Sequence, residues 1–337
     1  MISNTLQYDS KRNRVVVDLA LPFARSGVSL RDSMRLQTTL KKQVSCVGVG
    51  LHSGRRVKLT LNPASVDTGI VFRRAGPDRI NIPATAHYLG RINHATCLAS
   101  GETKIETVEH LLAALRTLSV DNVLIELDAA EVPIMDGSAS PFVYLIREAG
   151  IREQKALQSF IRITHPVSVE HEGRLIAAYP SEKLRVTYTI NFDHPMLRHQ
   201  EYSLEVNETS FIEEIAPART FGFQESVEEL RQNGLALGGS LDNALVLNET
   251  GVLNDPLRFQ DEFVRHKILD VLGDLALLDK PLLAHIVAVR GGHSLHAELV
   301  QEILDATDRW ELATAPDPAE MALDIAREPV LAEPTVG

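Results

Sequence analysis

The chain has 337 residues, of which 44% are hydrophobic and 23% are charged, and its formal net charge is −11. This is the composition of a globular protein with one large domain or two ordinary ones. The acidic balance argues against a nucleic-acid partner, and the two cysteines, Cys46 and Cys97, cannot build a disulfide framework or a cysteine-rich zinc site. No apolar run approaches the roughly 20 residues of a membrane span, so we expect a cytoplasmic protein without an integral membrane segment.

The two ends of the chain differ from its middle. Residues 1–33 show no sustained hydrophobic period, and a strand-like run starts directly after Met34. We interpret 1–33 as a disordered N-terminal tail or a misassigned start, with a short ordered arm as the alternative. Residues 311–337 form a C-terminal tail, rich in Pro and Glu from Ala315 onwards, that we expect to be loosely ordered.

Residues 34–152 are expected to form a first α/β domain. The stretch 43–62 reads as strand, glycine turn and strand. Its segment VGVGLHSG does not predict dinucleotide binding, because the glycine spacing differs from the fingerprint and a strand follows instead of a helix. The first long helix is predicted from about Thr103 to about Leu118. The apolar residues that share one face of this helix are Val108, Leu111, Leu112 and Leu115. A strand, NVLIELD, and a helix ending at Gly150 complete the first half.

The polar, unpatterned segment 150–158 predicts a domain boundary, and 153–310 is expected to form a second α/β domain. Several strands come first, followed by a glycine-rich segment at about 217–247. A long helix is predicted from about Gln260 to about Leu278, then a strand, AHIVAV, and a helix from about Ser294 to about Arg309. Each half therefore runs strands, helix, strand, helix, an order that favours an α+β fold with helices on one face of each sheet.

Two helices carry side chains that suit metal chemistry. Glu109 and His110 lie roughly opposite the apolar stripe of the first helix, so they should face water or a cleft; a solvated surface pair is the alternative. In the second helix, His266 and Asp270 are spaced i, i+4 and lie on one face, with Asp274 one turn further. That spacing allows both side chains to bind one ion, although an exposed charge pair would have the same spacing.

A third segment, Arg290-Gly-Gly-His293, follows a strand and opens a helix. Glycines there let the backbone approach a ligand, and an ordinary turn with a surface histidine is the alternative. Two histidines and one aspartate with one open position form the pattern of catalytic zinc sites. A nearby carboxylate can accept the proton of the attacking water, and a histidine can protonate a leaving amine. The combination predicts metal-assisted hydrolysis of an amide.

The chain resembles the UDP-3-O-acyl-N-acetylglucosamine deacetylase family from about Met34 to about Leu304. The stretches that carry the resemblance are VGVGLHSG, TVEHLLAAL, PIMDGSASPFVYL, ARTFGF, LALGGSLDNALV, EFVRHKILDVLGDLAL and GGHSL. The resemblance implies two similar domains, each a β-sheet layered on two helices, with the active site between the helix layers. It also implies zinc-dependent removal of the N-acetyl group of UDP-3-O-acyl-GlcNAc with release of acetate. That reaction is the committed step in the biosynthesis of lipid A for the Gram-negative outer membrane.

The family's functional positions map onto residues of this chain, and every role here follows from the resemblance. It implies that zinc is held by three ligands: His110, His266 and Asp270. It implies four catalytic roles. Glu109 would be the general base, and His293 would be the general acid or the cation that stabilises the transition state. Asp274 would orient His293, and Thr220 would donate a hydrogen bond to the oxyanion. Lys267 would meet the diphosphate. Phe192 would pack on the nucleotide, with plain core packing as the alternative. His52 also fits the family, and we expect it to be structural.

The resemblance further implies that the insert at about 217–247 forms an apolar passage for the acyl chain. The residues expected in this passage are Phe221, Phe223, Val227, Leu230, Leu235, Leu237 and Leu241. We expect a monomer whose partner is the small-molecule substrate. Two alternatives stay open: Fe²⁺ in place of Zn²⁺, because two histidines and a carboxylate also suit iron, and a non-catalytic nucleotide-sugar binding protein.

Overall fold

A computed structural model of the chain describes residues 5–9, 14–18 and 35–313, except 77, 78, 93 and 255. Within the first 34 residues it describes β1 (Thr5–Asp9) and β2 (Arg14–Asp18), which pair antiparallel. Most of the two predicted tails lies outside the described residues. No helix in the described part of the chain is long and apolar enough to cross a membrane.

Two five-stranded sheets share one topology. Their strand orders are β4-β5-β10-β6-β7 and β13-β14-β20-β15-β16. Neighbouring strands are antiparallel except for β10 with β6 and β20 with β15, which occupy the same place in the two sheets. The bounds of the first sheet are β4 Val44–Val49, β5 Arg56–Pro63, β6 Ile70–Arg74, β7 Asn81–Pro83 and β10 Val123–Leu127. Those of the second are β13 Val167–His171, β14 Arg174–Tyr179, β15 Arg185–Ile190, β16 Gln200–Glu205 and β20 His285–Val289.

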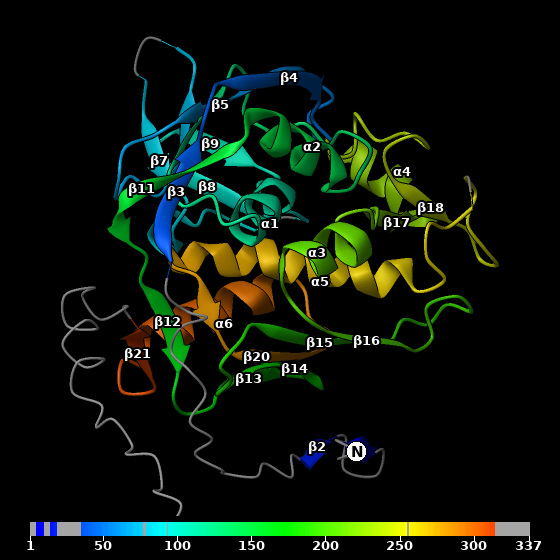
Figure 1. The fold of residues 1–337 in the computed structure, drawn as a ribbon. Coiled ribbons are helices and arrows are strands. Elements are labelled where there is room, and N and C mark those ends of the chain that lie inside the picture. Colours follow the sequence, from blue (N-terminus) through cyan, green and yellow to red (C-terminus); the bar gives the residue numbers. More distant parts are fainter. Residues whose placement is uncertain are drawn as a thin grey trace, which may run out of the picture.

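The long helices repeat in the same way. In the first half, α1 (Glu109–Thr117) precedes the parallel strand β10 and α2 (Ser140–Ala149) follows it. In the second half, α5 (Glu262–Leu275) precedes β20 and α6 (His293–Asp305) follows it. Figure 1 shows the helices as a central layer with one sheet on either side. The α+β fold with two similar sheet-and-helix units is confirmed.

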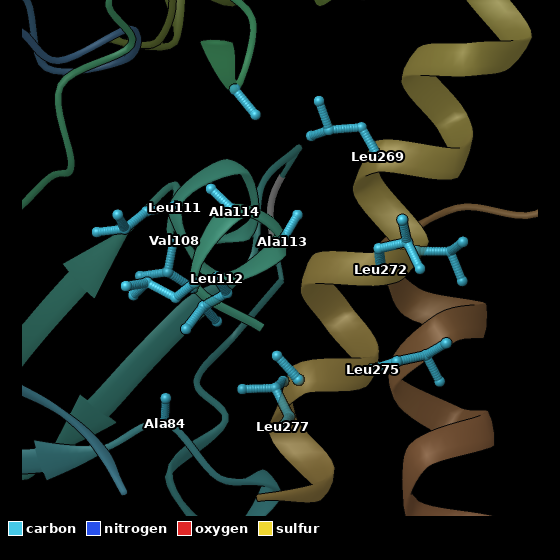
Figure 2. Close-up of a cluster of buried hydrophobic side chains, with 14 of the residues drawn as sticks. Ala84, Val108, Leu111, Leu112, Ala113, Ala114, Leu269, Leu272, Leu275 and Leu277 are labelled. Atoms are coloured by element: carbon cyan, nitrogen blue, oxygen red, sulfur yellow. The ribbon is translucent and has the colours of Figure 1, made fainter. Parts of the chain in front are cut away.

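The two helix layers meet where α1 packs on α5, the most extensive contact between helices in the described chain. Figure 2 shows this contact, with Ala113 of α1 on the side toward α5 and Leu111 on the opposite side, toward the strands. Because a second helix covers the side of α1 that carries Glu109 and His110, these two residues are only 3% and 4% exposed. A solvated surface pair is therefore ruled out at this position.

The first helix is shorter than predicted. Thr103–Glu106 forms strand β9, which pairs with β8 (Cys97–Ser100), and the helix starts only at Glu109. Thr107 separates the two elements with a φ of 60°, a conformation that β-branched residues rarely adopt. Its hydroxyl donates a hydrogen bond to Glu131, which holds this backbone break in place.

The expected linker at 150–158 is mostly strand. β11 (Ile151–Leu157) pairs antiparallel with β3 (Leu36–Leu40), so tertiary pairing orders a segment that has no clear alternation. The predicted boundary between 152 and 153 falls inside β11, and the division into two domains remains a proposal. A smaller sheet has the order β19-β12-β21, with bounds Leu282–Leu283, Phe160–Ile163 and Trp310–Ala313.

The glycine-rich insert of the second half folds beside the α5 layer. It contains β17 (Phe221–Phe223), α4 (Gln224–Gln232) and β18 (Leu245–Leu247), and the two strands pair in parallel. The remaining short elements are η2 (Ala86–Tyr88), α3 (Glu208–Ser210), the π-helical turn η3 (Phe211–Ile215) and η4 (Ala276–Leu278). Together α5 and η4 match the second predicted helix closely, while α6 ends four residues before the predicted Arg309.

Candidate active site

Three potential metal ligands from two helices converge at the α1–α5 contact. His110 lies in the first turn of α1, and His266 and Asp270 lie one turn apart on α5. One donor atom from each of the three lies within 4.8 Å of the other two. The Asp270 Oδ1 atom is 3.3 Å from His266 Nε2 and 3.7 Å from His110 Nε2. Around a tetrahedral ion with bonds of about 2.0–2.1 Å, ligand atoms lie roughly 3.3–3.4 Å apart, so these donors fit a divalent metal.

The ionisation of this trio also fits a metal. Burial lowers the pKa of His266 to about 3, although Asp270 opposes the shift, so the ring stays neutral. Its Nδ1 atom lies 3.0 Å from the Ala218 carbonyl oxygen, which fixes Nδ1 as the protonated nitrogen and leaves Nε2 free to bind. Burial alone would raise the pKa of Asp270, but Lys267 and His266 hold it well below its usual range. The carboxylate is therefore ionised, as a metal ligand must be.

Glu109 and His293 face each other beside the trio. The Glu109 Oε1 atom is 3.7 Å from His293 Nε2, and that nitrogen is 3.9 Å from Asp270 Oδ2. The other oxygen of Glu109 accepts a hydrogen bond from the Thr96 backbone N–H. Burial raises the pKa of Glu109, although His293 opposes the shift, so this carboxylate is a stronger base than a solvated one.

Asp274 lies behind His293 and contacts its second ring nitrogen. His293 Nδ1 is 2.8 Å from Asp274 Oδ2. Burial by itself would lower the pKa of His293, but Asp274 and Asp270 raise it to about 10, so the ring is protonated near neutral pH. The Nδ1 proton is held by Asp274, which leaves the Nε2 proton directed toward Glu109 and the trio.

The ligand trio, Glu109 and His293 line a cavity of about 630 Å³, while Asp274 lies behind its wall. Thr220, just before β17, and Lys267 both line it. The Lys267 Nζ atom is 2.7 Å from Asp270 Oδ2 and 5.7 Å from the centre of the Phe221 ring. A cation and a hydroxyl donor therefore share the cavity with the ligand trio.

The chain was then compared with known proteins. The family model described as UDP-3-O-acyl N-acetylglycosamine deacetylase matches residues 37–305, from β3 to the end of α6. A curated relative, the UDP-3-O-acyl-N-acetylglucosamine deacetylase of Pseudomonas entomophila (strain L48), is 50% identical over 280 residues. That alignment covers 82% of this chain and 92% of the relative. The chain belongs to this deacetylase family. The family match spans every residue of the candidate site.

Both aromatic and aliphatic side chains line the cavity beside the trio. Phe192 lies 6.1 Å from Phe221 and 5.9 Å from Phe223, measured between ring centres, and all three rings line the cavity. The aliphatic residues that line it include Val227, Leu230, Leu241, Val246 and Leu253. Leu235 and Leu237, which the family resemblance suggested, are not among the lining residues, and Leu237 is 54% exposed. The deacetylase fold thus joins a polar centre to an apolar extension.

Several polar residues of the site escaped sequence reasoning. Thr96, which donates to Asp274 through its hydroxyl, lies in a stretch with no recognisable motif. Glu131 accepts hydrogen bonds from the backbone of His52 and Ser53 and so shapes the loop at the cavity wall. His296 also contacts Asp274, and its i, i+3 spacing from His293 is a signal that could have revealed it.

His52, for which we expected a structural role, is buried at the wall of the cavity. It lines the cavity, and its Nε2 atom is buried without a hydrogen-bond partner among the described residues. A buried ring nitrogen that lacks a partner is a position where a ligand atom can form a hydrogen bond.

Proposed function

We propose that this protein hydrolyses the N-acetyl group of UDP-3-O-acyl-N-acetylglucosamine and releases acetate. Its membership of the deacetylase family supports the reaction and the substrate. The observation that carries the proposal is the convergence of His110, His266 and Asp270 within 4.8 Å, with Glu109 and His293 facing each other beside them. Binding of a nucleotide sugar alone does not need a buried base and a buried acid at one point.

The proposed metal is one zinc ion held by the three ligands. When bound, zinc would polarise the amide carbonyl and lower the pKa of a water molecule. The donor set of two neutral imidazoles and one carboxylate also suits Fe²⁺, which is the alternative. Elemental analysis of freshly purified protein distinguishes the two metals.

The protein's own groups would move the protons. Glu109 Oε1, the carboxylate oxygen not held by Thr96, would accept a proton from the attacking water. The water oxygen bonds to the acetyl carbon, the C–N bond breaks, and His293 Nε2 would donate its proton to the departing amine. Asp274 holds the opposite nitrogen of this ring and keeps Nε2 directed into the site.

The remaining cavity residues would bind the substrate. Thr220 would donate a hydrogen bond to the carbonyl oxygen as negative charge develops on it. Lys267 would contact the diphosphate, because an ammonium group is a compact point charge suited to phosphate oxygens. Phe192 would pack on the nucleotide. The rings of Phe221 and Phe223, with Val227 and Leu230 beyond them, would bind the acyl chain.

The test is a deacetylation assay on UDP-3-O-acyl-GlcNAc, with the free amine detected by mass spectrometry. We expect turnover by the purified protein, its loss after chelator treatment, and recovery with added zinc. Glu109→Ala should retain the metal and lose most of its turnover. The matched control is Glu298→Ala, which changes an exposed carboxylate paired with His171 and should behave like wild type. Turnover that persists after complete removal of metal would contradict the proposed chemistry.

A further inference from the structure

A second layer of polar side chains lies behind the proposed acid–base pair. Asp274 is 1% exposed and receives hydrogen bonds from three groups. Its Oδ2 atom lies 2.8 Å from His293 Nδ1 and 2.8 Å from His296 Nδ1, and its Oδ1 atom accepts from the Thr96 hydroxyl. His296 therefore fixes the same carboxylate oxygen that holds His293.

The other nitrogen of His296 is also engaged. His296 Nε2 lies 3.0 Å from the Tyr188 hydroxyl, and both side chains are fully buried. Burial disfavours ionisation of Asp274, but His293 and the hydrogen bonds to the carboxylate hold its pKa at about 2, so it carries no proton. His296 Nδ1 must then donate to Asp274. Burial also lowers the pKa of His296 and keeps the ring neutral, so Nε2 is the acceptor for the Tyr188 hydroxyl.

The Tyr188–His296 pair also supports the backbone that leads into α6. A Cβ atom on Gly291 would lie 2.6 Å from the Tyr188 hydroxyl oxygen and 3.1 Å from His296 Nε2. Only a glycine fits here without displacing the pair. Gly291 lies two residues before His293. The pair therefore contacts the Asp274 carboxylate, which holds the His293 ring, and also the loop that positions the His293 Cα atom.

We propose that the buried Tyr188–His296 pair is a positioning element for His293, acting through Asp274 and through the Gly291 backbone. This inference rests on the proposed function, in which His293 protonates the leaving amine. Tyr188 lies on β15 of the second sheet, so the pair ties the sheet to the acid on α6. Neither member of the pair lines the cavity, and both act without touching substrate.

Substitutions at position 296 separate positioning from simple packing. His296→Leu fills the space but removes both hydrogen bonds, whereas His296→Asn can place an amide N–H where Nδ1 donates to Asp274. We expect His296→Leu to lower kcat by about tenfold to hundredfold, the usual effect of losing a partner behind a functional side chain. KM and metal content should stay at the wild-type values, and His296→Asn should restore kcat to within about threefold of wild type. His285→Leu, at a partly buried histidine on β20, is the control.

Tyr188 is tested together with Gly291. Tyr188→Phe removes only the hydroxyl and should lower kcat severalfold, with Tyr179→Phe on β14 as its control. Gly291→Ala should lower kcat more strongly, because the new methyl group meets the hydroxyl oxygen. The double variant Tyr188→Phe/Gly291→Ala should recover part of that loss, because its closest clash is gone. Absence of any recovery would refute the contact between the pair and the loop.

A readout that does not need turnover separates this inference from the proposed function. Nitrogen-15 NMR of the metal-loaded protein, with His296→Asn used to assign the signal, should report His296 as the Nδ1-protonated tautomer. That result supports the positioning element even if UDP-3-O-acyl-GlcNAc is not hydrolysed, an outcome that would refute the function alone. Three results would overturn the inference. They are an Nε2-protonated tautomer of His296, a wild-type kcat for His296→Leu, and a kcat for His296→Asn as low as that of His296→Leu.

Discussion

The two helix layers approach each other closely at Gly273, and replacing this glycine with alanine is the sharpest test of how the site is assembled. A Cβ atom at position 273 would lie 2.1 Å from the carbonyl oxygen of Glu109 and 2.8 Å from its Cα atom. Both are backbone atoms at the start of α1, so no side chain can rotate away to relieve the clash. Figure 2 shows how closely α1 and α5 pack along the rest of this contact.

The expected size of the effect follows from these distances. Ordinary contacts of a Cβ atom begin at 3.4 Å, so the start of α1 must move by about 1.3 Å, the difference between 3.4 and 2.1 Å. Overpacking of this kind costs about 1–3 kcal/mol, against a gain of about 1 kcal/mol from the higher helix propensity of alanine. The net loss of stability should be small. The movement carries Glu109 and His110 away from α5, however, and a misplacement of about 1 Å can cost roughly a hundredfold in rate.

The assay measures metal content, kcat and thermal unfolding for Gly273→Ala and for a control, Gly251→Ala. Gly251 has a single neighbour within reach, the Met196 sulfur at 4.0 Å, so alanine fits there. We expect Gly273→Ala to lose turnover by about a hundredfold and to bind metal more weakly, while the control stays near wild type. A Gly273→Ala variant that keeps full metal content and wild-type kcat and unfolds at a higher temperature would refute this reasoning. Helix propensity alone would then determine the stability of the variant.

Other perturbations test the buried groups around the site. Glu262 is 0% exposed and accepts hydrogen bonds from Arg219 and from the Arg258 backbone. Glu262→Gln leaves the Arg219 charge without its counter-ion and should destabilise the fold by about 3–5 kcal/mol in urea unfolding. The control is Glu311→Gln, which changes an exposed pair with Arg162 and should alter stability by less than about 1 kcal/mol. Burial raises the pKa of the Cys46 and Cys97 thiols to about 11. At pH 8 roughly one thousandth of each thiol is then ionised. Iodoacetamide should therefore modify the native protein slowly at pH 8, and the rate of modification should increase as the pH rises. Rapid labelling at pH 8 would contradict this prediction.

The sequence predicted the local elements and the metal trio for identifiable physical reasons. The i, i+4 spacing of His266 and Asp270 guarantees that both side chains leave α5 on one side, whatever α5 packs against. The strands β4, β5 and β10 show the β-branched residues and turn glycines that predict them. Such features depend on a few neighbouring residues, so they can be derived without knowledge of the tertiary structure.

The errors arise where distant segments decide the outcome. Glu109 and His110 were expected to face water or a cleft, and they do line the cavity. Their deep burial under α5 could not be foreseen, because no pattern within α1 reveals a partner such as His266, which lies 156 residues after His110 (266 − 110). The strand β11 was missed because its sequence has no clear alternation of apolar and polar residues. Its order comes from pairing with β3. Thr96 is invisible for the same reason, since its partner Asp274 lies 178 residues further along the chain. His296 is the exception, because its spacing from His293 already places both rings on one side of α6.

The repeated topology explains why the site lies where it does. α1 and α5 occupy equivalent positions in the two sheet-and-helix units, and they meet at Gly273 with almost no space between their backbones. The two units contribute different residues to the candidate site: the first supplies Glu109 and His110, while the second supplies His266, Asp270, Asp274 and His293. Neither unit alone carries the complete set of proposed ligands or the complete proposed acid–base pair. If the proposed site binds a metal, that binding is coupled to the packing of α1 on α5, because a metal bound by both helices stabilises only the state in which they are in contact.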